Sequence, residues 1–447
     1  MSAQQPPQQN QASPNQQEEK PKTVINLIDL RNMDIKALHA KAKSIGLEYN
    51  RQSRQDLLFA IQKLLVKKGA KLILDGESSG VLEIVQDGYG FLRSPQTSYN
   101  PGPDDIYVPP QVIKQYRLKT GAVFTKVTLR APNRGERYFA VDEAIEVNGR
   151  PIAEQSLLVP FGDKPAEFPT EWLKLEQGNG HKSDTIGRII DIVAPLGKGQ
   201  RSLIVAPPKS GKTVMLQSIA NAILKSNPEC KVFMLLLDER PEEVTDNIRT
   251  VNAEIIASAF DNPPSRHIQV AEMVLAKAKR LAESGDDVVI LLDSLTRLAR
   301  AYNHVAATDN KILSGGISAS ALQRPKRFFG AARNLMDGGS LSIIATALID
   351  TGSKADEVIY EEFKGTGNHE VHLMRSLAQK RIYPAIDVKQ SGTRKEEILV
   401  SPEYLNYCWI LRKYLQTMDD AQATELVVSR IEATKTNAKF FESMKET

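Results

Sequence analysis

The sequence has few of the features that mark secreted, membrane-spanning or zinc-stabilised proteins. Only two cysteines, Cys230 and Cys408, occur among 447 residues. Two isolated cysteines make neither a disulfide framework nor a zinc site, so we expect a reducing, cytoplasmic compartment. No uncharged apolar stretch reaches about 18 residues, so we expect neither a transmembrane helix nor a membrane partner.

The start of the chain also lacks the basic segment and the apolar core of a secretory signal. Gln, Pro, Asn and Ser dominate residues 1–22, which predicts a disordered tail. The net charge is only +4, yet residues 1–150 carry 21 Lys and Arg against 16 Asp and Glu, whereas the rest carries 37 against 38. This surplus hints at a polyanion partner for the N-terminal third, although a chance fluctuation explains it as well.

The length exceeds what one hydrophobic core usually serves, so several domains are expected. Apolar residues at helical spacing, with a capping box from Ser53 to Asp56, predict a helical module over residues 23–72. Further along, the apolar period becomes two, and short strand candidates such as VLEIVQ, GFLR and VFTKVTLR are separated by turn residues. This pattern predicts a small barrel over residues 76–150, followed by a connector over residues 151–182.

The remainder, residues 183–447, alternates apolar strands with helical stretches. RSLIVA, KVFMLLLD, EIIASAF, DVVILLD and SLSIIATALI are near-continuous apolar runs, as fully buried parallel strands are. Amphipathic segments such as IQVAEMVLAKAKRLAESG lie between them. We therefore expect an α/β domain with a mostly parallel sheet.

The sequence APPKSGKT, which begins at Ala206, connects one of these strands to a helical stretch. This is the setting of a phosphate-binding P-loop, where backbone N–H groups at a helix start favour anions. Gly211 allows close approach of the backbone, Lys212 can reach the β- and γ-phosphates, and the hydroxyl of Thr213 can hold Mg²⁺. Lys209 adds a second cation. Ala206 replaces the usual first glycine, which is a mild departure because alanine is small.

Two other strands end in acids. DVVILLD ends at Asp293, the position of an acid that holds Mg²⁺ through water, and KVFMLLLD ends at Asp238, which Glu239 follows. A carboxylate at the second position could orient and deprotonate the water that attacks the γ-phosphate. Because the carboxyl ends of parallel strands meet at one rim, these acids should lie near the P-loop. Taken alone, each acid fits a helix cap or a solvated loop equally well. Arg394, in the loop SGTRKEE, is a candidate arginine finger, although a single Arg is more often a surface residue.

The barrel segment DGYGFLR places Tyr89, Phe91 and Arg93 at alternate positions, so in a strand they share one face. Two rings and a guanidinium on an exposed face would form a platform for unpaired bases, worth about 1–3 kcal/mol per stacked base. Tyr107 and Tyr138 could complete this platform, although the Phe that follows Tyr138 is an equally good candidate for the outward side chain. A GYGF strand is typical of cold-shock-like OB barrels, which bind single strands. Ordinary barrel core is the alternative.

With these motifs together, the chain from about residue 23 to its C-terminus resembles the family of bacterial transcription termination factor Rho. The matching segments are DGYGFLRS, GPDDIYVPP, GERYFAVDEAIEVNG, APPKSGKT, LLLDERPEEVTD, LLDSLTRLARAYN, ALQRPKRFFGAARN, IDTGSKADEVIYEEFKGTGN and SGTRKEE. The resemblance implies a RecA-like P-loop ATPase domain behind the helical module and the OB barrel. It also implies a homohexameric ring that uses ATP and Mg²⁺ to translocate RNA, unwinds RNA–DNA hybrids 5′ to 3′, binds C-rich nascent RNA, and releases transcripts from RNA polymerase.

The resemblance also assigns residues to sites. The primary RNA site would be Tyr89, Phe91, Arg93, Asp105, Tyr107, Glu136, Arg137 and Tyr138. Nucleotide contacts would come from Pro207, Pro208, Lys209, Ser210, Gly211, Lys212, Thr213, Val214, Arg240 and Tyr383, the last stacking on adenine. Catalysis would involve Lys212, the base Glu239, the metal-linked acid Asp293, and Arg381 and Arg394 acting on the ATP of a neighbouring subunit. Thr213 and Asp293 would hold the metal. Two pore loops, 311–316 and 351–356, would contribute Lys311, Ile312, Gly315, Gly316, Thr351, Gly352 and Lys354.

Two rival functions remain open. Another RecA-like motor, such as the catalytic subunit of a rotary ATPase, would share the P-loop but would lack an OB barrel with GYGF. An RNA-binding protein with a degenerate nucleotide site would not need the intact P-loop and its two acids. The departures from the family pattern are small, since Tyr89 and Tyr383 stand where Phe is common and both keep a ring.

Overall fold

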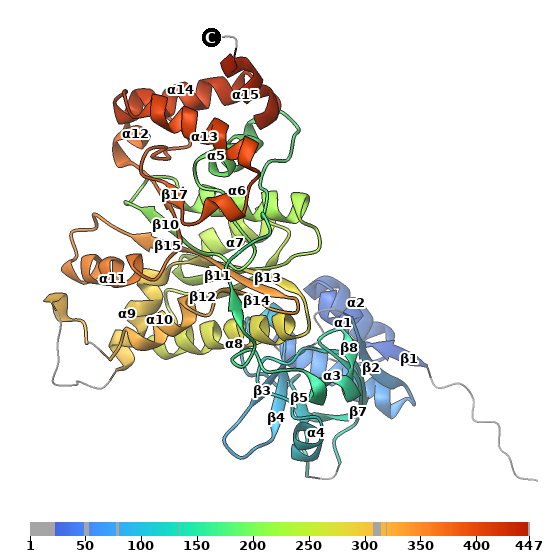
Figure 1. The fold of residues 1–447 in the computed structure, drawn as a ribbon. Helices are drawn as coiled ribbons and strands as arrows, with labels where there is room; N and C mark the ends of the chain where they lie inside the picture. Colours follow the sequence, from blue (N-terminus) through green and yellow to red (C-terminus); the bar gives the residue numbers. More distant parts are fainter. Residues whose placement is uncertain are drawn as a thin grey trace, which may run out of the picture.

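The computed structural model describes residues 23–48, 53–76, 80–133, 135–306, 314–318 and 320–445. The predicted tail over residues 1–22 lies outside the described residues. Figure 1 shows a smaller N-terminal part, coloured blue to teal, beside a larger part that runs from green to red. In the described part of the chain, every helix is too short or too polar to span a bilayer.

The N-terminal segment consists mainly of short helices. Its elements are β1 Val24–Asn26, α1 Leu27–Asn32, α2 Ile35–Ser44 and α3 Arg54–Lys67. The predicted start of α3 at an N-cap Ser53 is confirmed, because the Asp56 backbone N–H donates to Ser53 Oγ (3.2 Å). The Ser53 hydroxyl in turn donates to the Asp56 carboxylate (2.6 Å). Leu38 and Ala42 on α2 are fully buried, as their spacing predicts.

The predicted barrel is present, and the N-terminal helices are built onto it. Its strands are β2 Lys71–Asp75, β3 Val81–Ile84, β4 Gly90–Arg93, β5 Ile106–Val108, β6 Phe124–Arg130, β7 Phe139–Val147 and β8 Arg150–Pro151, with α4 Pro110–Gln115 after β5. They form a sheet of order β1-β2-β6-β7-β5-β4-β3, and an antiparallel bridge between Val81 and Val123 joins the end strand β3 to the start of β6 and closes the barrel. β1 pairs in parallel with β2, and one hydrophobic core contains side chains of both helices and strands, such as Leu58 and Phe124.

The C-terminal part contains the expected sheet. Its strand order is β12-β11-β13-β15-β10-β16-β17. The bounds are β10 Arg201–Ala206, β11 Lys231–Glu239, β12 Glu254–Ala259, β13 Asp287–Asp293, β15 Ser340–Leu348, β16 His369–His372 and β17 Gly392–Thr393. All pairs in this order are parallel except β16 with β17, so the predicted mostly parallel sheet is confirmed. β14 Arg333–Leu335 pairs antiparallel with β15, and the connector adds β9 Ala166–Glu167 beside it.

Helices cover both faces of this sheet, as Figure 1 shows. The helices are α5 Thr185–Val193, α6 Lys212–Ser226, α7 Pro241–Thr250, α8 Pro264–Glu283, α9 Leu295–Val305, α10 Gln323–Phe329, α11 Lys354–Lys364, α12 Arg375–Gln379, α13 Pro402–Leu415, α14 Asp420–Glu432 and α15 Asn437–Lys445. Successive residues of β10 point to opposite cores: Leu203 packs with the α8–α11 side, and Ile204 packs with the α5, α6 and α13–α15 side. Both faces of the strands are therefore buried, which explains their continuous apolar sequences.

The barrel is tied to the C-terminal part at the edge strand β12 and at α8. The buried Tyr99 hydroxyl donates to Glu254 Oε1 (3.2 Å), and the buried Lys277 ammonium donates to both carboxylate oxygens of Glu254 (2.7 Å each). Gly121 has φ +95°, and a Cβ there would lie 2.2 Å from the Ala276 carbonyl carbon. Such a close approach leaves room only for glycine, so the barrel is docked tightly against α8.

Candidate functional site

The P-loop connects the end of β10, at Ala206, to the start of α6, at Lys212. Gly211 adopts the left-handed conformation (φ +93°) just before the helix, which a side chain would strain. The Ser210 hydroxyl donates to the Pro207 carbonyl (2.7 Å) and closes the loop. The loop therefore leads directly into the N-terminus of a 15-residue helix, where free backbone N–H groups form an anion site.

The predicted lysine and two predicted acids meet at this rim of the sheet. Lys212 Nζ lies 3.0 Å from Glu239 Oε1 and 2.5 Å from Asp293 Oδ1. The Thr346 hydroxyl, on the neighbouring strand β15, donates to Asp293 Oδ1 (2.9 Å). Both carboxyl groups are buried, with Glu239 4% and Asp293 2% exposed. The lysine that would hold phosphates is thus paired with two carboxylates of its own chain.

The end of β11 shows why Glu239, and not Asp238, faces the P-loop. Asp238 has a positive φ of +57°, and the pairing of β11 with β12 shifts register between Leu237 and Glu239. This irregularity interrupts the strand alternation and leaves Asp238 to bind Arg297, whose Nη1 donates to Asp238 Oδ2 (2.6 Å). Arg297 Nε also lies 3.6 Å from Glu239 Oε1, so two cations flank this carboxylate.

Burial sets the ionisation of the cluster. It raises the pKa of Glu239, although Lys212 and Arg297 lower it, and it also raises the pKa of Asp293. Burial lowers the pKa of Lys212, but the two carboxylates raise it by more, so its net shift is upward. A carboxylate with a raised pKa beside a permanent cation suits proton transfer near neutral pH.

A cavity of about 690 Å³ lies beside the P-loop. Its lining residues are Lys182, Thr185, Ile186, Lys209, Ser210, Gly211, Val214, Met215, Tyr383, Pro384, Ala385 and Glu432. Val214 and Tyr383 are 61% and 48% exposed, so the cavity offers apolar surface to a flat ring as well as an anion site. The volume fits a nucleotide. The nearby hydroxyl of Thr213 and carboxylate of Asp293 are the hard oxygen ligands that Mg²⁺ prefers.

Sequence reasoning missed several residues around this cavity. Lys182 and Glu432 line it from segments far from the P-loop in sequence, and no local pattern marks them. Arg297 stands one helical turn after Asp293 in a segment already singled out, and Thr346 is a lone polar residue in the apolar run of β15. Those two positions carried a weak signal: a charged residue on a helix that starts at the rim, and a buried hydroxyl in a core strand.

Three predicted arginines lie outside the cavity within one chain. Arg240, Arg381 and Arg394 are exposed, and the cavity lining contains none of them. Arg394 follows β17 at the edge of the sheet, where its backbone N–H donates to the Asn368 carbonyl. The action of Arg381 and Arg394 on the nucleotide of a neighbouring subunit, which the family resemblance implies, stays a prediction.

The predicted ring platform exists on the barrel. The Phe91 ring centroid lies 5.7 Å from that of Tyr89, 6.2 Å from Tyr107 and 5.0 Å from Tyr138. All four rings are partly exposed. The next residue, Phe139, is only 1% exposed, so Tyr138 is the outward side chain. We call these four residues the ring cluster.

The expectation that Arg93 offers an exposed guanidinium is wrong. Arg93 is 7% exposed, its Nε donates to Glu83 Oε2 (2.6 Å), and its Nη1 donates to Asp105. The guanidinium lies 4.9 Å from the Phe91 ring centroid. Two acids from neighbouring segments draw the side chain inward, so Arg93 supports the ring cluster. Burial raises the pKa of Asp105 to about 6, although the Gly102 N–H and Arg93 lower it.

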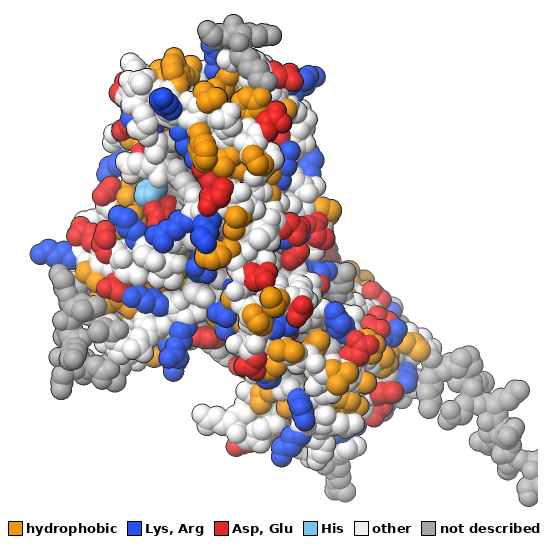
Figure 2. Space-filling model, in the orientation of Figure 1, with side chains coloured by type: hydrophobic (Ala, Val, Ile, Leu, Met, Phe, Trp, Pro, Cys, Tyr) orange, Lys and Arg blue, Asp and Glu red, His pale blue; other side chains and the backbone are white. Residues whose placement is uncertain are grey.

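The edge of the ring cluster is charged. Glu136 accepts two hydrogen bonds from Arg130 (2.5 and 2.9 Å) and one from the Asn133 backbone N–H (2.8 Å), which lower its pKa to about 2. The guanidinium of Arg137 lies 5.7 Å from the Tyr138 ring centroid. Figure 2 shows acidic and basic side chains interspersed over the face it draws, so the N-terminal charge surplus forms no single basic field there.

The two predicted pore loops lie together where the structure describes them. Gly315 has φ +77°, and a Cβ there would lie 2.7 Å from the Ala355 backbone nitrogen, so this turn packs against the start of α11. Lys354, the first residue of α11, is exposed. Gly316, Thr351 and Gly352 are exposed as well. Lys311 and Ile312 lie outside the described residues.

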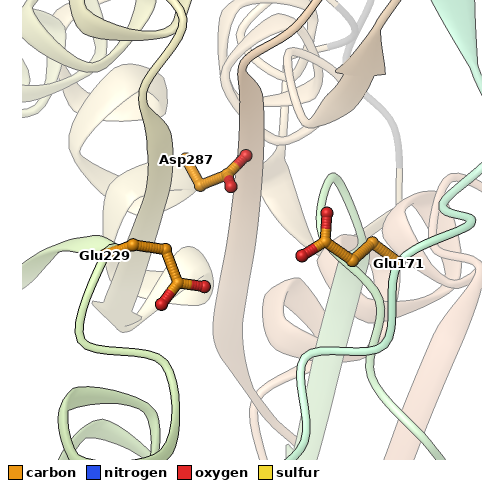
Figure 3. A group of neighbouring side chains, drawn as sticks. All are labelled: Glu171, Glu229 and Asp287. Atoms are coloured by element: carbon orange, nitrogen blue, oxygen red, sulfur yellow. The ribbon is translucent and has the colours of Figure 1, made fainter.

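Three further acids gather at the opposite rim of the sheet. Figure 3 shows the carboxylates of Glu171, Glu229 and Asp287 facing one space, and they are the one such group of potential metal ligands among the described residues. Lys198 already fills that space: its Nζ lies 3.0 Å from Glu229, 2.8 Å from Asp287, and also contacts Glu171. Burial lowers the pKa of Lys198 and the three carboxylates raise it by more, so the ammonium stays charged. The cluster thus pins the connector to the sheet.

Three protein-family models match the chain. The Rho termination factor N-terminal domain matches residues 29–70, and the Rho termination factor RNA-binding domain matches residues 78–153. The nucleotide-binding domain of the ATP synthase alpha/beta family matches residues 187–393. Among solved structures, an ATPase from the type III secretion system of pathogenic bacteria has a TM-score of 0.52 at 20% identity, covering 63% of this chain and 86% of that chain. This likeness shows the ATPase fold alone.

Curated relatives match over nearly the whole chain. Transcription termination factor Rho of Pseudomonas aeruginosa is 54% identical over 424 residues, and that of Chromobacterium violaceum is 54% identical over 422 residues. The Escherichia coli K12 protein of the same name is 52% identical over 422 residues. Each alignment covers 94% of this chain and 100% of the relative. The chain therefore belongs to the transcription termination factor Rho family.

Proposed function

We propose that this protein terminates transcription as an ATP-driven RNA translocase and 5′–3′ RNA–DNA helicase that pulls nascent RNA away from RNA polymerase. One observation carries the proposal: a single chain combines a complete P-loop rim with an exposed ring cluster on an OB barrel. A rotary-type ATPase needs the first and has no use for the second. The names of the relatives and the two Rho family models support the same activity.

The nucleotide step follows from the charges at the rim. When ATP enters, its phosphates compete with Glu239 and Asp293 for the Lys212 ammonium, because both partners are anionic. Lys212 then holds the β- and γ-phosphates, and Glu239 is free to accept a proton from the attacking water. Mg²⁺, held by Thr213 and through water by Asp293, would neutralise phosphate charge. Arg297 keeps Glu239 beside the γ-phosphate position.

Arg394 and Arg381 complete the site from a neighbouring subunit in this proposal. Both are exposed and lie outside the cavity of their own chain. A guanidinium that reaches the γ-phosphate from another subunit stabilises the charge of the transition state. Hydrolysis would therefore depend on assembly into a ring, which we take to be the homohexamer of the family.

The ring cluster would bind RNA by stacking unpaired bases. Three other partly exposed rings have centroids within 6.2 Å of that of Phe91, and together the four rings offer a surface on which small flat bases can stack. The partly exposed pair Arg130–Glu136 at its edge offers donors and acceptors to the polar edge of a base. This arrangement suits pyrimidines, and C-rich RNA in particular.

The deciding experiment measures phosphate release by the full-length protein with and without C-rich RNA. We expect turnover to depend on RNA and to fall by a hundredfold or more, the order of magnitude for loss of a general base, in Glu239→Gln. Glu242→Gln, at an exposed position on α7, is the matched control and should keep full turnover. RNA-independent turnover would favour a general RecA-like motor, and full turnover in Glu239→Gln would remove this residue from the mechanism.

A further inference from the structure

A second cavity, of about 610 Å³, lies where the barrel, the connector and the ATPase part meet. Its walls come from the turn after α4, from residues 160–162 of the connector, from α8, and from α10 with the segment that follows it. Figure 1 shows α8 along the border between the two parts of the molecule. The cavity is separate from the nucleotide cavity and shares no lining residue with it.

The lining is strongly cationic. It includes Lys119, Lys279, Arg280, Arg327 and Arg333, against a single acid, Glu272. Glu272 accepts a hydrogen bond from the Tyr302 hydroxyl, and Arg280 is paired with Glu283. Among the residues that the structure describes, the other four cations have no ion pair within 4 Å. A positive surplus in a recess binds anions, because the charges focus there and bulk solvent screens them less.

Two of these cations lie over the ring of one buried phenylalanine. The Phe161 ring is 4% exposed, with Lys279 Nζ 5.8 Å and the Arg333 guanidinium 5.1 Å from its centroid. Arg333 Nε also donates to the Ala331 carbonyl (3.2 Å). Burial lowers the pKa of Lys279. The positive charges of Arg280 and Arg333 lower it as well, whereas the negative charge of Glu272 raises it. An anion in the cavity would relieve this mutual repulsion.

The position of the cavity favours a contact with the same RNA strand that the ring cluster would bind. Gln269, on the same helix α8, donates to Glu83 Oε1 (3.0 Å), and Glu83 holds Arg93 beneath Phe91. The ten residue steps along α8 from Gln269 to Lys279 span about 15 Å. At the other wall, α10 begins a few residues after residues 314–316, the described part of the first predicted pore loop.

We propose that this cavity, which we call the basic cavity, is an additional RNA contact that binds phosphate groups of the strand beyond the bases on the ring cluster. The inference rests on the proposed function, because it requires a single strand anchored on the barrel. Lysine and arginine supply sequence-independent, salt-dependent affinity for phosphates, and the RNA backbone presents them at every nucleotide. The basic cavity would thus guide the strand without reading its sequence.

The test compares a short C-rich RNA that only the ring cluster can hold with a longer C-rich RNA. The variant Lys119→Gln/Arg327→Gln removes two exposed cations, so folding should be unaffected. Lys413→Gln/Lys439→Gln, on exposed faces of α13 and α15, makes the same charge change elsewhere. Binding of the full-length protein is measured by fluorescence anisotropy from about 50 to 300 mM salt. Affinity that depends on phosphate contacts falls steeply over this range.

We expect the first variant to bind the short RNA normally and the longer RNA on the order of tenfold more weakly at low salt. The slope of log K against log salt should fall by about 1.4, since each single-strand phosphate contact contributes about 0.7. An unchanged slope and affinity for the longer RNA, or an equal loss for both RNAs, would overturn the proposal. Wild-type protein that binds neither RNA would instead overturn the proposed function itself.

A chemical footprint identifies the occupant directly. Acetylation of Lys119 and Lys279 is followed by mass spectrometry with the longer RNA, with inorganic triphosphate, and with neither. The proposal requires protection by the longer RNA and none by the short one. Protection by triphosphate but not by RNA would identify a small-anion site, and protection in the protein without ligand would identify an acidic segment of another copy. Either result would overturn the RNA contact.

Discussion

The nucleotide rim and the ring cluster prepare for their ligands in opposite ways. At the rim, the recognition group Lys212 is occupied by two buried carboxylates, so a ligand must displace ion pairs before it is held. On the barrel, the rings are open to solvent, and the charges beside them are already paired, as in Arg93 with Asp105. Ligand binding at the rim therefore exchanges one set of ion pairs for another, whereas ligand binding on the barrel leaves the existing ion pairs in place. The comparison predicts that single substitutions at the rim disturb both folding and catalysis, whereas those on the barrel disturb binding alone.

The largest effect is expected for Lys212→Ala. ATP hydrolysis should fall by a hundred- to a thousandfold or more, on the order found when one charge-stabilising donor is lost. Two buried carboxyl groups would also lose their cation, so we expect about 3 kcal/mol lower stability in urea unfolding above neutral pH. Lys209→Ala, an exposed loop lysine, is the control for stability. A variant as stable as the wild type would show that the rim does not depend on the ion pairs.

Next in size is Phe91→Ala on the barrel. Loss of the central ring should weaken C-rich RNA binding by about 1–3 kcal/mol per displaced base, measured by anisotropy. Affinity for ATP in the absence of RNA and thermal stability should change little, because Phe91 is partly exposed. Tyr414→Ala removes a more exposed ring from α13 (57% exposed) and should leave RNA binding intact. Equal losses in the two variants would contradict the assignment.

A smaller effect concerns pH and Asp105. Its pKa of about 6 lies above the ordinary value, so folding takes up a proton between about pH 4 and 6, and ionisation of this group weakens the fold as pH rises through 6. We expect Asp105→Asn to remove about 1.4 kcal/mol of this dependence between pH 5 and 7.5, which urea unfolding at these two pH values would reveal. Glu136→Gln is the contrast, since the low pKa of that exposed carboxyl predicts no such change over the same range.

The smallest expected effect sharpens the account of the rim. Thr346→Val keeps the shape of a buried side chain but removes the hydrogen bond to Asp293, at a cost of about 1 kcal/mol. ATP turnover should fall only a few-fold, because Lys212 still contacts Asp293. Thr245→Val, on α7, deletes a hydroxyl that bonds only to its own helix, so ATP turnover should stay unchanged. A large loss in Thr346→Val would mean that the hydroxyl holds the acid in place.

Much of the rim was predictable because its parts are consecutive residues at strand ends. APPKSGKT, Asp293 and Glu239 each follow a buried strand, and parallel strands must bring these ends to one edge. The choice between Asp238 and Glu239 could not be derived from alternation, since a register shift and a positive φ decide it. Lys182 and Glu432 could not be predicted from the sequence for a different reason, because only the tertiary fold brings them to the cavity.

On the barrel, alternation correctly predicted which side chains share a face but not what lies around them. Tyr89 and Phe91 are outward as their spacing requires, whereas Arg93 on the same face is buried. Its exposure depends on Glu83 and Asp105, which belong to other segments and carry no sequence signal of their own. Long side chains can fold back to partners that periodicity does not reveal.

The barrel's grip on Glu254 has a mechanical consequence. That carboxylate opens β12, which lies beside β11, and β11 ends in Glu239. Tyr99 of the barrel and Lys277 of α8 both donate hydrogen bonds to this carboxylate. Force on RNA bound to the barrel would therefore act on β12, the neighbour of the strand that ends in Glu239, the proposed catalytic base.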